Sequence, residues 1–386
     1  MIGLHLNKLF PALCLWMVVC HGLMAQADHP VHIKVFHEKG MYGGWPANNG
    51  VWRWGNEILV GFSKGYHKDL GRSHNIDRER TEWNLLARSL DGGETWSIED
   101  PGKQGVYVPK VSFGIQRTDV GIPETKQLEV PINFAHPDFA LIARTNTYWY
   151  SYDRGKTWEG PFGLPTVDAT TVLAARTDYI IDGPKTALIF LTLSSSPDKE
   201  GRVGCFRTVD GGLTWSLVSY LGEEPTDGFS IMPASVRLSA HELIVATREK
   251  VAKLTKIGMY YSNDNGMSWM KLKNAVEDTG VGNPPAMIRL TDGTLCLVYG
   301  YRSDTESIEA GSSTSDIRAK LSSDNGQTWS EDIILRNDGS GRDIGYPRVV
   351  QRPDGKVVAI YYFMDRQTGA ERYIGATIWT PPPSRD

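Results

Sequence analysis

The chain has 386 residues, of which 40% are hydrophobic and 22% are charged, and its formal net charge is −4. This is the composition of a globular protein with enough apolar residues for a sizeable core, and it excludes a disordered or collagen-like chain. At about 150 residues per domain the length predicts two or three domains, unless internal repeats build one larger domain.

The first 27 residues have the pattern of a secretory signal peptide. Lys8 is their only Lys, Arg, Asp or Glu, an apolar run covers 13–19, and small residues follow at 25–27. We predict cleavage after Ala25 or Ala27, and hence a secreted or periplasmic protein. A membrane anchor is the alternative, but the apolar run is shorter than the roughly 20 residues of a spanning helix.

Charge and cysteine content exclude several kinds of partner. The chain has no block of Lys and Arg, so no nucleic-acid partner is predicted. No metal ion or other cofactor is predicted either, because HExxH and paired CxxC motifs are absent and the nine histidines are scattered. Cys205 and Cys296 lie in apolar, strand-like runs, which favours two buried free thiols over a disulfide.

An eight-residue motif recurs along the chain. Five segments share the pattern S/T-x-D-x-G-x-T/S-W: residues 89–96, 151–158, 208–215, 262–269 and 322–329. The pattern is typical of a hairpin turn in which the Asp accepts backbone N–H groups, the Gly takes a positive φ, and the Trp folds back onto the sheet. Catalytic or calcium-binding roles for these Asp residues are the alternative, but five equivalent turns favour a structural role.

The spacing of the motif predicts the architecture. Successive Asp residues are 54 to 62 positions apart, and each interval holds three or four short β-branched or aromatic runs, which indicates one four-stranded antiparallel sheet. Six such sheets fit the chain, so we predict an all-β, six-bladed β-propeller forming a single domain over 28–386. Because the sixth motif is missing, we expect residues 32–36 and 373–379 to close the ring together.

The repeated motif resembles the Asp-box of the sialidase (neuraminidase) superfamily, and the resemblance covers essentially all of the chain after the signal peptide. It implies a secreted exo-glycoside hydrolase. Members of this superfamily bind the carboxylate of sialic acid with three arginines. They use a Tyr activated by a Glu as nucleophile, and an Asp on a first-blade loop as acid/base. A planar guanidinium matches a carboxylate in a bidentate manner, and a neutral Tyr is not repelled by that carboxylate.

The resemblance assigns roles to several residues of this chain. Tyr346 precedes the last predicted hairpin as the nucleophile of the superfamily does. Arg248 and Arg302 each end a predicted strand where a substrate arginine is expected, and Arg348 is a further candidate. Asp77 lies 14 residues before the first Asp-box, the place of the acid/base, although counting from the preceding hairpin leads instead to Asp69, Arg72 and His74.

Two positions depart from the pattern of the superfamily. Ala47 stands where the first arginine is expected, and Met232 stands where the Glu partner of the nucleophile is expected. The other polar residues expected to face the central depression are Asn48, Asn49, His136, Asp138 and Asn283. Of the polar residues, Asn48, Asn49, His74 and His136 are expected to bind substrate. His74 and His136 are also candidate acid/base groups near neutral pH.

Three functions therefore stay open at this point. The leading hypothesis is removal of a terminal acidic sugar, sialic acid or a relative, from a glycan by a monomeric enzyme without a membrane span. The second is a divergent propeller glycosidase or lyase that acts on another uronic or deoxy sugar, with a histidine transferring the proton. The third is a propeller that binds glycans without catalysis, since a fold alone does not decide function.

Overall fold

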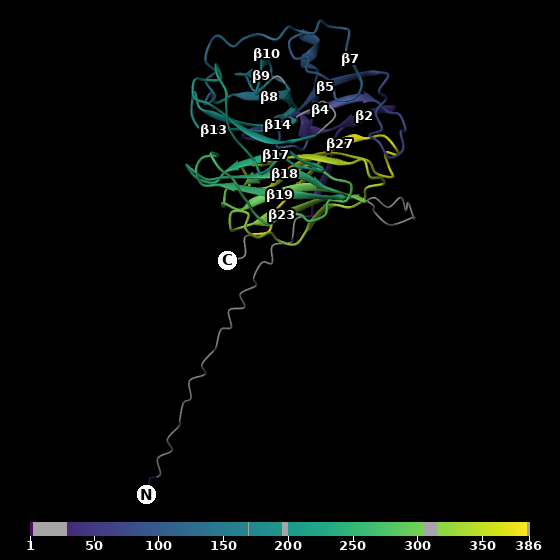
Figure 1. Cartoon of the computed structure of the whole chain (residues 1–386). Coiled ribbons are helices and arrows are strands. Elements are labelled where there is room, and N and C mark those ends of the chain that lie inside the picture. Colours follow the sequence, from purple (N-terminus) through teal and green to yellow (C-terminus); the bar gives the residue numbers. More distant parts are fainter. Residues whose placement is uncertain (3–28, 169, 195–199, 304–314, 384–386) are drawn as a thin grey trace.

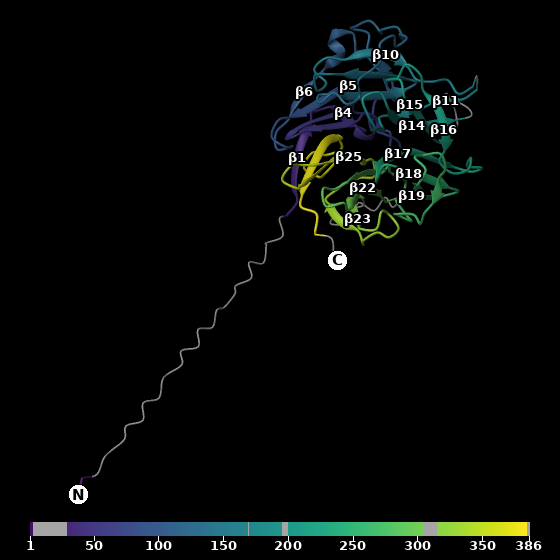
Figure 2. The same cartoon turned by 90° about the vertical axis from the view of Figure 1, so that its left-hand side faces the viewer.

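The computed structural model describes residues 1–2, 29–168, 170–194, 200–303 and 315–383. Residues 3–28, which hold most of the predicted signal peptide, lie outside the described residues. Six β-sheets follow one another in chain order, and the last strands of the chain lie beside the first (Figures 1 and 2). The predicted six-bladed propeller is confirmed.

The first three sheets, or blades, hold strands β2 to β16. Blade 1 contains β2 (Met41–Gly44), β3 (Val51–Trp54), β4 (Glu57–Tyr66), β5 (Thr81–Ser89), β6 (Ser97–Glu99) and the short β7 (Ile115–Gln116). Blade 2 contains β8 (Ala140–Thr145), β9 (Thr147–Ser151), β10 (Glu159–Gly163) and β12 (Ala175–Arg176). Blade 3 contains β11 (Val172–Leu173), β13 (Tyr179–Ile181), β14 (Ala187–Ser194), β15 (Arg202–Thr208) and β16 (Ser216–Tyr220).

The last three blades complete the ring. Blade 4 contains β17 (Phe229–Arg237), β18 (Leu243–Val251), β19 (Leu254–Ser262) and β20 (Met270–Lys271). Blade 5 contains β21 (Ala286–Arg289), β22 (Leu295–Arg302), β23 (Ser315–Ser322) and β24 (Ile333–Arg336). Blade 6 contains β25 (Gly345–Gln351), β26 (Val357–Phe363), β27 (Tyr373–Trp379) and β1 (Val31–Phe36).

The two ends of the described chain close the ring in blade 6. Strand β1 pairs antiparallel with β27, with Val31 opposite Ile378 and Phe36 opposite Ile374. Figure 2 shows the purple β1 beside the yellow strands of the same sheet. The predicted closure by residues 32–36 and 373–379 is therefore confirmed.

The five repeated motifs form the turns between the third and fourth strands of blades 1 to 5. In the first, the Asp91 carboxylate accepts hydrogen bonds from the backbone N–H groups of Glu94 and Thr95 and from the Thr95 hydroxyl. Gly93 has a φ of +96°, and the Trp96 indole donates to the Gly93 carbonyl. In each of the other four motifs the Asp carboxylate likewise accepts the backbone N–H and the hydroxyl of the Thr or Ser four residues later, so the structure agrees with the structural interpretation of the repeat.

The core lies between neighbouring blades. The second strand of a blade is covered on both faces, so it reads as a continuous apolar run rather than an alternating one. Residues 295–299 of β22 are all buried, and so are residues 58–62 of β4. Cys205 and Cys296 are buried free thiols, as predicted. Among the described residues, no helix has the length and apolar character needed to cross a membrane.

The inner strands are irregular where they meet at the centre. In blade 1, β2 and β3 both pair with β4 and are separated by a 3-10 turn, η1 (Pro46–Asn48). A second 3-10 turn, η2 (Pro101–Gln104), follows β6 in the chain. Between blades 2 and 3, the segment 172–181 serves both sheets, because β11 and β13 pair with β14 whereas β12 pairs with β8.

Three inner residues share an unusual backbone conformation. Trp45, Met232 and Tyr346 have φ values of +57°, +53° and +49°, and each precedes a proline. Met232 and Tyr346 lie in bulges of β17 and β25, where the strand register shifts. Positive φ is rare for residues with large side chains, and such strain persists where the surrounding structure imposes it, often at functional sites.

Candidate functional site

A cavity of about 460 Å³ opens at the centre of the propeller. It is lined by side chains of two kinds, cations and aromatic rings, together with small polar groups. The lining residues are Trp45, Asn48, His74, Lys110, Val111, Ser112, Phe113, Arg144, Thr145, Ala174, Ala175, Arg176, Glu200, Arg248 and Tyr346. Four of them are Lys or Arg, and Glu200 is the only carboxylate among the described lining residues, so the cavity has an excess of positive charge.

Arg144 and Arg176 enter the cavity from adjacent strands. They are directly opposite each other across β8 and β12. Arg144 is buried, and its guanidinium donates to the Asn49 side chain at 2.9 Å and to the Lys110 carbonyl at 3.1 Å. Arg176 donates from Nε to the Asn48 side chain at 3.0 Å, while its buried Nη1 has no hydrogen-bond partner among the described residues. Burial lowers the pKa of both guanidinium groups.

Arg248, near the middle of β18, lines the same cavity as this pair of arginines and contacts Tyr346. Its Nη1 donates to the Tyr346 hydroxyl at 3.2 Å, and its buried Nε has no hydrogen-bond partner in the described part of the chain. The guanidinium also lies over the Phe229 ring, 5.2 Å from the centroid. Arg144, Arg176 and Arg248 therefore form a set of three arginines, which we call the arginine cluster.

Tyr346 is held by its backbone as well as by Arg248. Its N–H donates to the Asn283 side chain at 2.9 Å, and the Asn283 amide donates to the Ile344 carbonyl at 2.9 Å. Both bonds are buried, so Asn283 fixes the bulge that gives Tyr346 its positive φ. The described residues place an arginine, and no carboxylate, within hydrogen-bonding distance of the Tyr346 hydroxyl.

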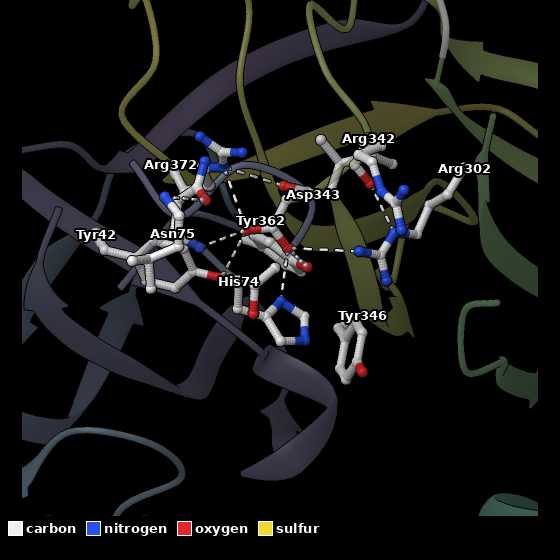
Figure 3. A network of polar contacts seen from close by, with 12 residues as sticks. Tyr42, His74, Asn75, Arg302, Arg342, Asp343, Tyr346, Tyr362 and Arg372 are labelled. Atoms are coloured by element: carbon white, nitrogen blue, oxygen red, sulfur yellow. Dashed lines mark hydrogen bonds and ion pairs between the residues drawn. The ribbon is translucent and has the colours of Figure 1, made fainter. Parts of the chain in front are cut away.

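A second network lies on the other side of the cavity, around the buried Asp343 (Figure 3). Its carboxylate accepts from His74 Nδ1 at 2.6 Å and from the Tyr362 hydroxyl at 2.6 Å. Further donors are the Tyr42 hydroxyl and the Asn75 N–H, at 3.4 and 3.3 Å. Burial alone would raise the pKa of Asp343, but His74 and the guanidinium groups of Arg372 and Arg302 hold it well below its usual range.

The loop at 110–114 covers one side of the cavity. The buried Glu82 carboxylate accepts three backbone N–H groups from this loop, those of Ser112, Phe113 and Gly114, at 2.8 to 3.1 Å. The Phe113 ring lies against the rings of Trp45 and His74, with centroids 5.2 and 5.3 Å away. Glu82 thus fixes the loop as a wall of the cavity.

The structure brings together some of the residues that the sequence singled out. Tyr346, Arg248, Asn48 and His74 line the central cavity. Asn49 is fully buried behind it, where its side chain accepts from Arg144 and donates to the Trp45 carbonyl.

Other candidates lie away from the cavity wall. Arg302 is buried, donates from Nε to the Arg342 carbonyl at 2.6 Å, and lies 3.5 Å from Asp343. Arg348 donates to the backbone carbonyls of Ala47 and Thr177, both at 2.6 Å, and lines a separate cavity of about 330 Å³. Their roles in substrate binding stay predictions.

Asp77 and His136 are placed differently again. The Asp77 carboxylate pairs with Lys68 at 3.3 Å and accepts the Glu79 N–H, outside the cavity lining. The His136 ring lies tilted against the Tyr152 ring, with centroids 4.8 Å apart. His136 precedes β8 at the end of the strand that pairs with the Asp-box turn, whereas Arg144 lies at the cavity end of that strand. Their catalytic and binding roles likewise stay predictions.

Sequence reasoning missed Arg144, Arg176 and Asp343. A signal existed for Arg144, because the run 141–144 (LIAR) ends in arginine much as the run 245–248 (VATR) does. Met232 and Ala47, expected to interrupt the pattern of the superfamily, are buried and apolar in the structure, and Met232 packs in one cluster with Trp45 and Tyr346.

A larger cavity, about 700 Å³, lies beside β1 and is lined by residues such as His32, Arg336 and Asp365. None of the sequence-predicted site residues lines it, so the candidate site is the central cavity. In the described residues no group of three or more His, Cys, Asp or Glu side chains is arranged to hold a metal ion.

Solved structures with the same fold include a protein of unknown function from Dyadobacter fermentans, with a TM-score of 0.64 and 18% identity over 92% of this chain and 99% of that one. The NanB sialidase from Streptococcus pneumoniae has a TM-score of 0.55 and 12% identity, over 90% of this chain and 70% of that one. An α-L-arabinofuranosidase from Fusarium graminearum has a TM-score of 0.54 and 12% identity, over 92% and 98% of the two chains.

A search of curated protein sequences finds no match. A family model, the BNR repeat-like domain, matches residues 132–359, which is more than half of the chain. The matched residues include four of the five Asp-box turns. The chain therefore belongs to the BNR repeat-like domain family, with a sialidase-like propeller fold.

Proposed function

We propose that this protein is a glycoside hydrolase that removes a terminal acidic sugar, sialic acid or a relative, from a glycan. The observation that carries the proposal is the arginine cluster, which lines one cavity beside Tyr346. Similar folds occur in a sialidase and an α-L-arabinofuranosidase, which supports glycoside hydrolysis as the reaction class.

The arginine cluster is suited to an anionic ligand. Arg176 Nη1 and Arg248 Nε are buried donors with no hydrogen-bond partner among the described residues. Buried polar groups without partners are costly, and a planar carboxylate satisfies guanidinium groups in a bidentate manner. A sugar carboxylate bound between Arg176 and Arg248 would supply the missing acceptors.

The cavity also limits the size of the ligand. Its volume, about 460 Å³, lies within the range of clefts that hold one small ligand. Trp45 and the loop at 110–114 wall one side. This enclosure favours a terminal sugar over the middle of a long chain, and it places the bound sugar beside Tyr346, the predicted nucleophile.

The experiment compares a sugar acid with its ester. The purified protein is incubated with aryl glycosides of sialic acid and of a uronic acid, and with the methyl esters of the same compounds. We expect release from the free acids and little from the esters, because esterification removes the charge that the arginine cluster binds. Equal release from acids and esters would contradict the proposal.

Variants connect this preference to the arginine cluster. Arg176→Ala and Arg248→Ala should each raise KM for the acid far more than for the ester. Arg53→Ala is the matched control, because Arg53 is exposed and its side chain donates to the Gly55 carbonyl of the β3–β4 turn, away from the cavity lining. If activity falls as much in the control as in the other two variants, the arginine cluster is not what selects the acid.

A second candidate function is β-elimination on a uronate, a lyase reaction. It is favoured by the arginine at the Tyr346 hydroxyl, where a hydrolase of the sialidase type would have a carboxylate. Arginines that neutralise a uronate carboxylate make the proton on the neighbouring carbon easier to remove. An unsaturated product would establish this candidate instead. It would be detected by its ultraviolet absorbance and by a mass lower by one water than that of the hydrolysis product.

We also propose that the protein is secreted or periplasmic. The support is the pattern of the first 27 residues described above. Mass spectrometry of the protein isolated from the producing cells should find an N-terminus after Ala25 or Ala27. A mass that includes residues 1–27 would contradict this proposal.

A further inference from the structure

Asp343 is arranged as a hydrogen-bond acceptor on every side that the structure describes. It accepts from the Tyr42 and Tyr362 hydroxyls and from the Asn75 N–H, and it lies 3.3 and 3.5 Å from the guanidinium groups of Arg372 and Arg302. Hydroxyls, an N–H and two cations all favour the ionised carboxylate. Asp343 is therefore an ionised carboxylate that has no proton to donate.

This arrangement determines which nitrogen of His74 carries a proton. His74 Nδ1 lies 2.6 Å from the Asp343 carboxylate. Because the carboxylate can only accept, Nδ1 must be the donor, so the proton of the neutral ring is on Nδ1. Nε2 is then free to take up a proton or to give one away.

The ring of His74 is also fixed in position. Trp45 packs against it edge-on with centroids 5.2 Å apart, Phe113 lies at 5.3 Å, and Tyr346 lies edge-on at 6.0 Å. His74 nevertheless lines the central cavity. Figure 3 shows the ring between Asp343 and Tyr346, with its Nδ1 edge directed at the carboxylate.

We propose that His74 is the acid/base residue of this site, exchanging a proton with the bound sugar through Nε2, and that Asp343 is its positioning residue. The inference rests on the proposed function for its substrate but not for its geometry. It differs from the expectation for Asp77, whose carboxylate pairs with Lys68 outside the cavity lining.

The reaction balances with this one group and water. His74 starts as the imidazolium ion, which the ionised Asp343 stabilises. The glycosidic C–O bond breaks, its electron pair stays with the leaving oxygen, and that oxygen takes the proton from Nε2. Water then forms a bond to the anomeric carbon, and the proton that the water loses returns to Nε2. The products are the free sugar and the shortened glycan.

The test uses the dependence of the rate on the leaving group. A glycan leaving group needs a proton, whereas 4-nitrophenolate leaves without one. His74→Gln should therefore lower kcat/KM on a glycan by at least about 100-fold, the usual contribution of general acid catalysis. With the 4-nitrophenyl glycoside the loss should be much smaller. The matched control is His241→Gln, an exposed histidine in the turn before β18, which should leave both rates unchanged.

The role of Asp343 is tested with the variant Asp343→Asn and with an NMR measurement on His74 of the wild type. The variant should show the same leaving-group pattern as His74→Gln, with a lower kcat at nearly unchanged KM. Because Asp343→Asn exposes buried arginines to a neutral partner and can unfold the chain, nitrogen-15 NMR of the wild type should separately show neutral His74 protonated on Nδ1.

The outcomes separate this inference from the proposed function. Release of a neutral sugar alone, with the predicted pattern in His74→Gln, would overturn the acidic substrate and support His74. Release of an acidic sugar, with equal losses of rate for both leaving groups in His74→Gln, would support the acidic substrate and overturn the role of His74. The same conclusion would follow if Asp77→Asn, and not His74→Gln, showed the predicted dependence on the leaving group. A neutral ring protonated on Nε2 would also overturn the inference, and absence of any product from the wild type would overturn both.

Discussion

Arg144 and Arg176 lie directly opposite each other across β8 and β12, and both side chains line the central cavity. Like charges at directly opposed positions of a sheet are destabilising. The Asn48 and Asn49 side chains each accept one bond from the pair, but neither supplies a negative charge. Glu200 is the one carboxylate among the described lining residues, against four Lys and Arg side chains, so the pair lies in a cavity whose excess of positive charge suits an anionic ligand.

The first prediction is that this pair lowers the stability of the ligand-free protein and is needed to bind an acidic sugar. Arg176→Gln should raise the stability of the ligand-free protein by up to about 1 kcal/mol, because it removes a like charge from a cross-strand pair. The same variant should lose most of the thermal stabilisation that a free acidic sugar gives to the wild type. Differential scanning calorimetry with and without the sugar measures both effects, and a variant that is less stable yet binds equally well would contradict the argument.

The second prediction concerns the support of Tyr346. Asn283→Ala leaves the Tyr346 N–H and the Ile344 carbonyl without their buried partners. Each such group costs about 1 to 3 kcal/mol, so urea unfolding should show a loss of at least that size. Activity should fall as well, because the bulge no longer holds the Tyr346 ring. Tyr346→Phe keeps the backbone bonds and should lose activity with little loss of stability; the opposite ranking of the two variants in stability would sink this account.

The third prediction concerns pH. Burial raises the pKa of Asp178 to about 7 from its usual 3.8, against the opposing effects of Arg348 and of the bonds from Ser235. A carboxyl group whose pKa is raised by folding favours the native state below its unfolded pKa, and that contribution is lost as the pH rises through about 7. Relative to Asp178→Asn, the wild type should therefore lose stability between pH 4 and 8, by at most roughly 4 kcal/mol. Parallel stability curves for the two proteins would show that Asp178 is ionised in the fold.

The fourth prediction separates the structural role of the Asp-boxes from a catalytic one. The Thr95 hydroxyl bond, with further bonds from backbone and from Ser89, lowers the pKa of Asp91 to about 2. Its contribution is present above the unfolded pKa and is lost as the pH falls through about 2. Asp91→Ala should cost on the order of 1 kcal/mol at pH 7, less near pH 2, and leave kcat/KM unchanged. A variant with normal stability and no activity would instead assign chemistry to the motif.

The architecture was predictable because its signals are local. The Asp of an Asp-box finds its hydrogen-bond donors within four residues, as Asp91 does with Thr95, so the motif indicates its turn wherever it occurs. The sheet that closes the ring was predictable because the chain has five Asp-boxes for six blades. The strand-like runs at the two ends of the chain were left to form the sixth blade together. Trp45, Met232 and Tyr346, the three inner residues with positive φ, share one local feature in the sequence, the proline after each.

The site was less predictable because long-range pairing decides it. Strand β12 has two residues and no periodic pattern, so nothing local places Arg176 opposite Arg144. His74 and Asp343 are 269 residues apart and meet only because the ring closes. Arg302 and Arg348 were singled out by their positions on strands, but which face of a blade a side chain takes depends on packing between blades, and the structure directs both guanidinium groups to backbone carbonyls.

The central claim is that the cavity binds and releases a terminal acidic sugar. The most direct measurement incubates the protein, in the presence of a chelator, with a mixed panel of sialylated, uronate-bearing and arabinose-bearing glycans, and identifies the products by chromatography and mass spectrometry. The account predicts a free acidic sugar in the product mixture, and its loss in Arg176→Ala and Arg248→Ala. Release of arabinose alone, or acidic sugar released equally by both variants, would contradict it.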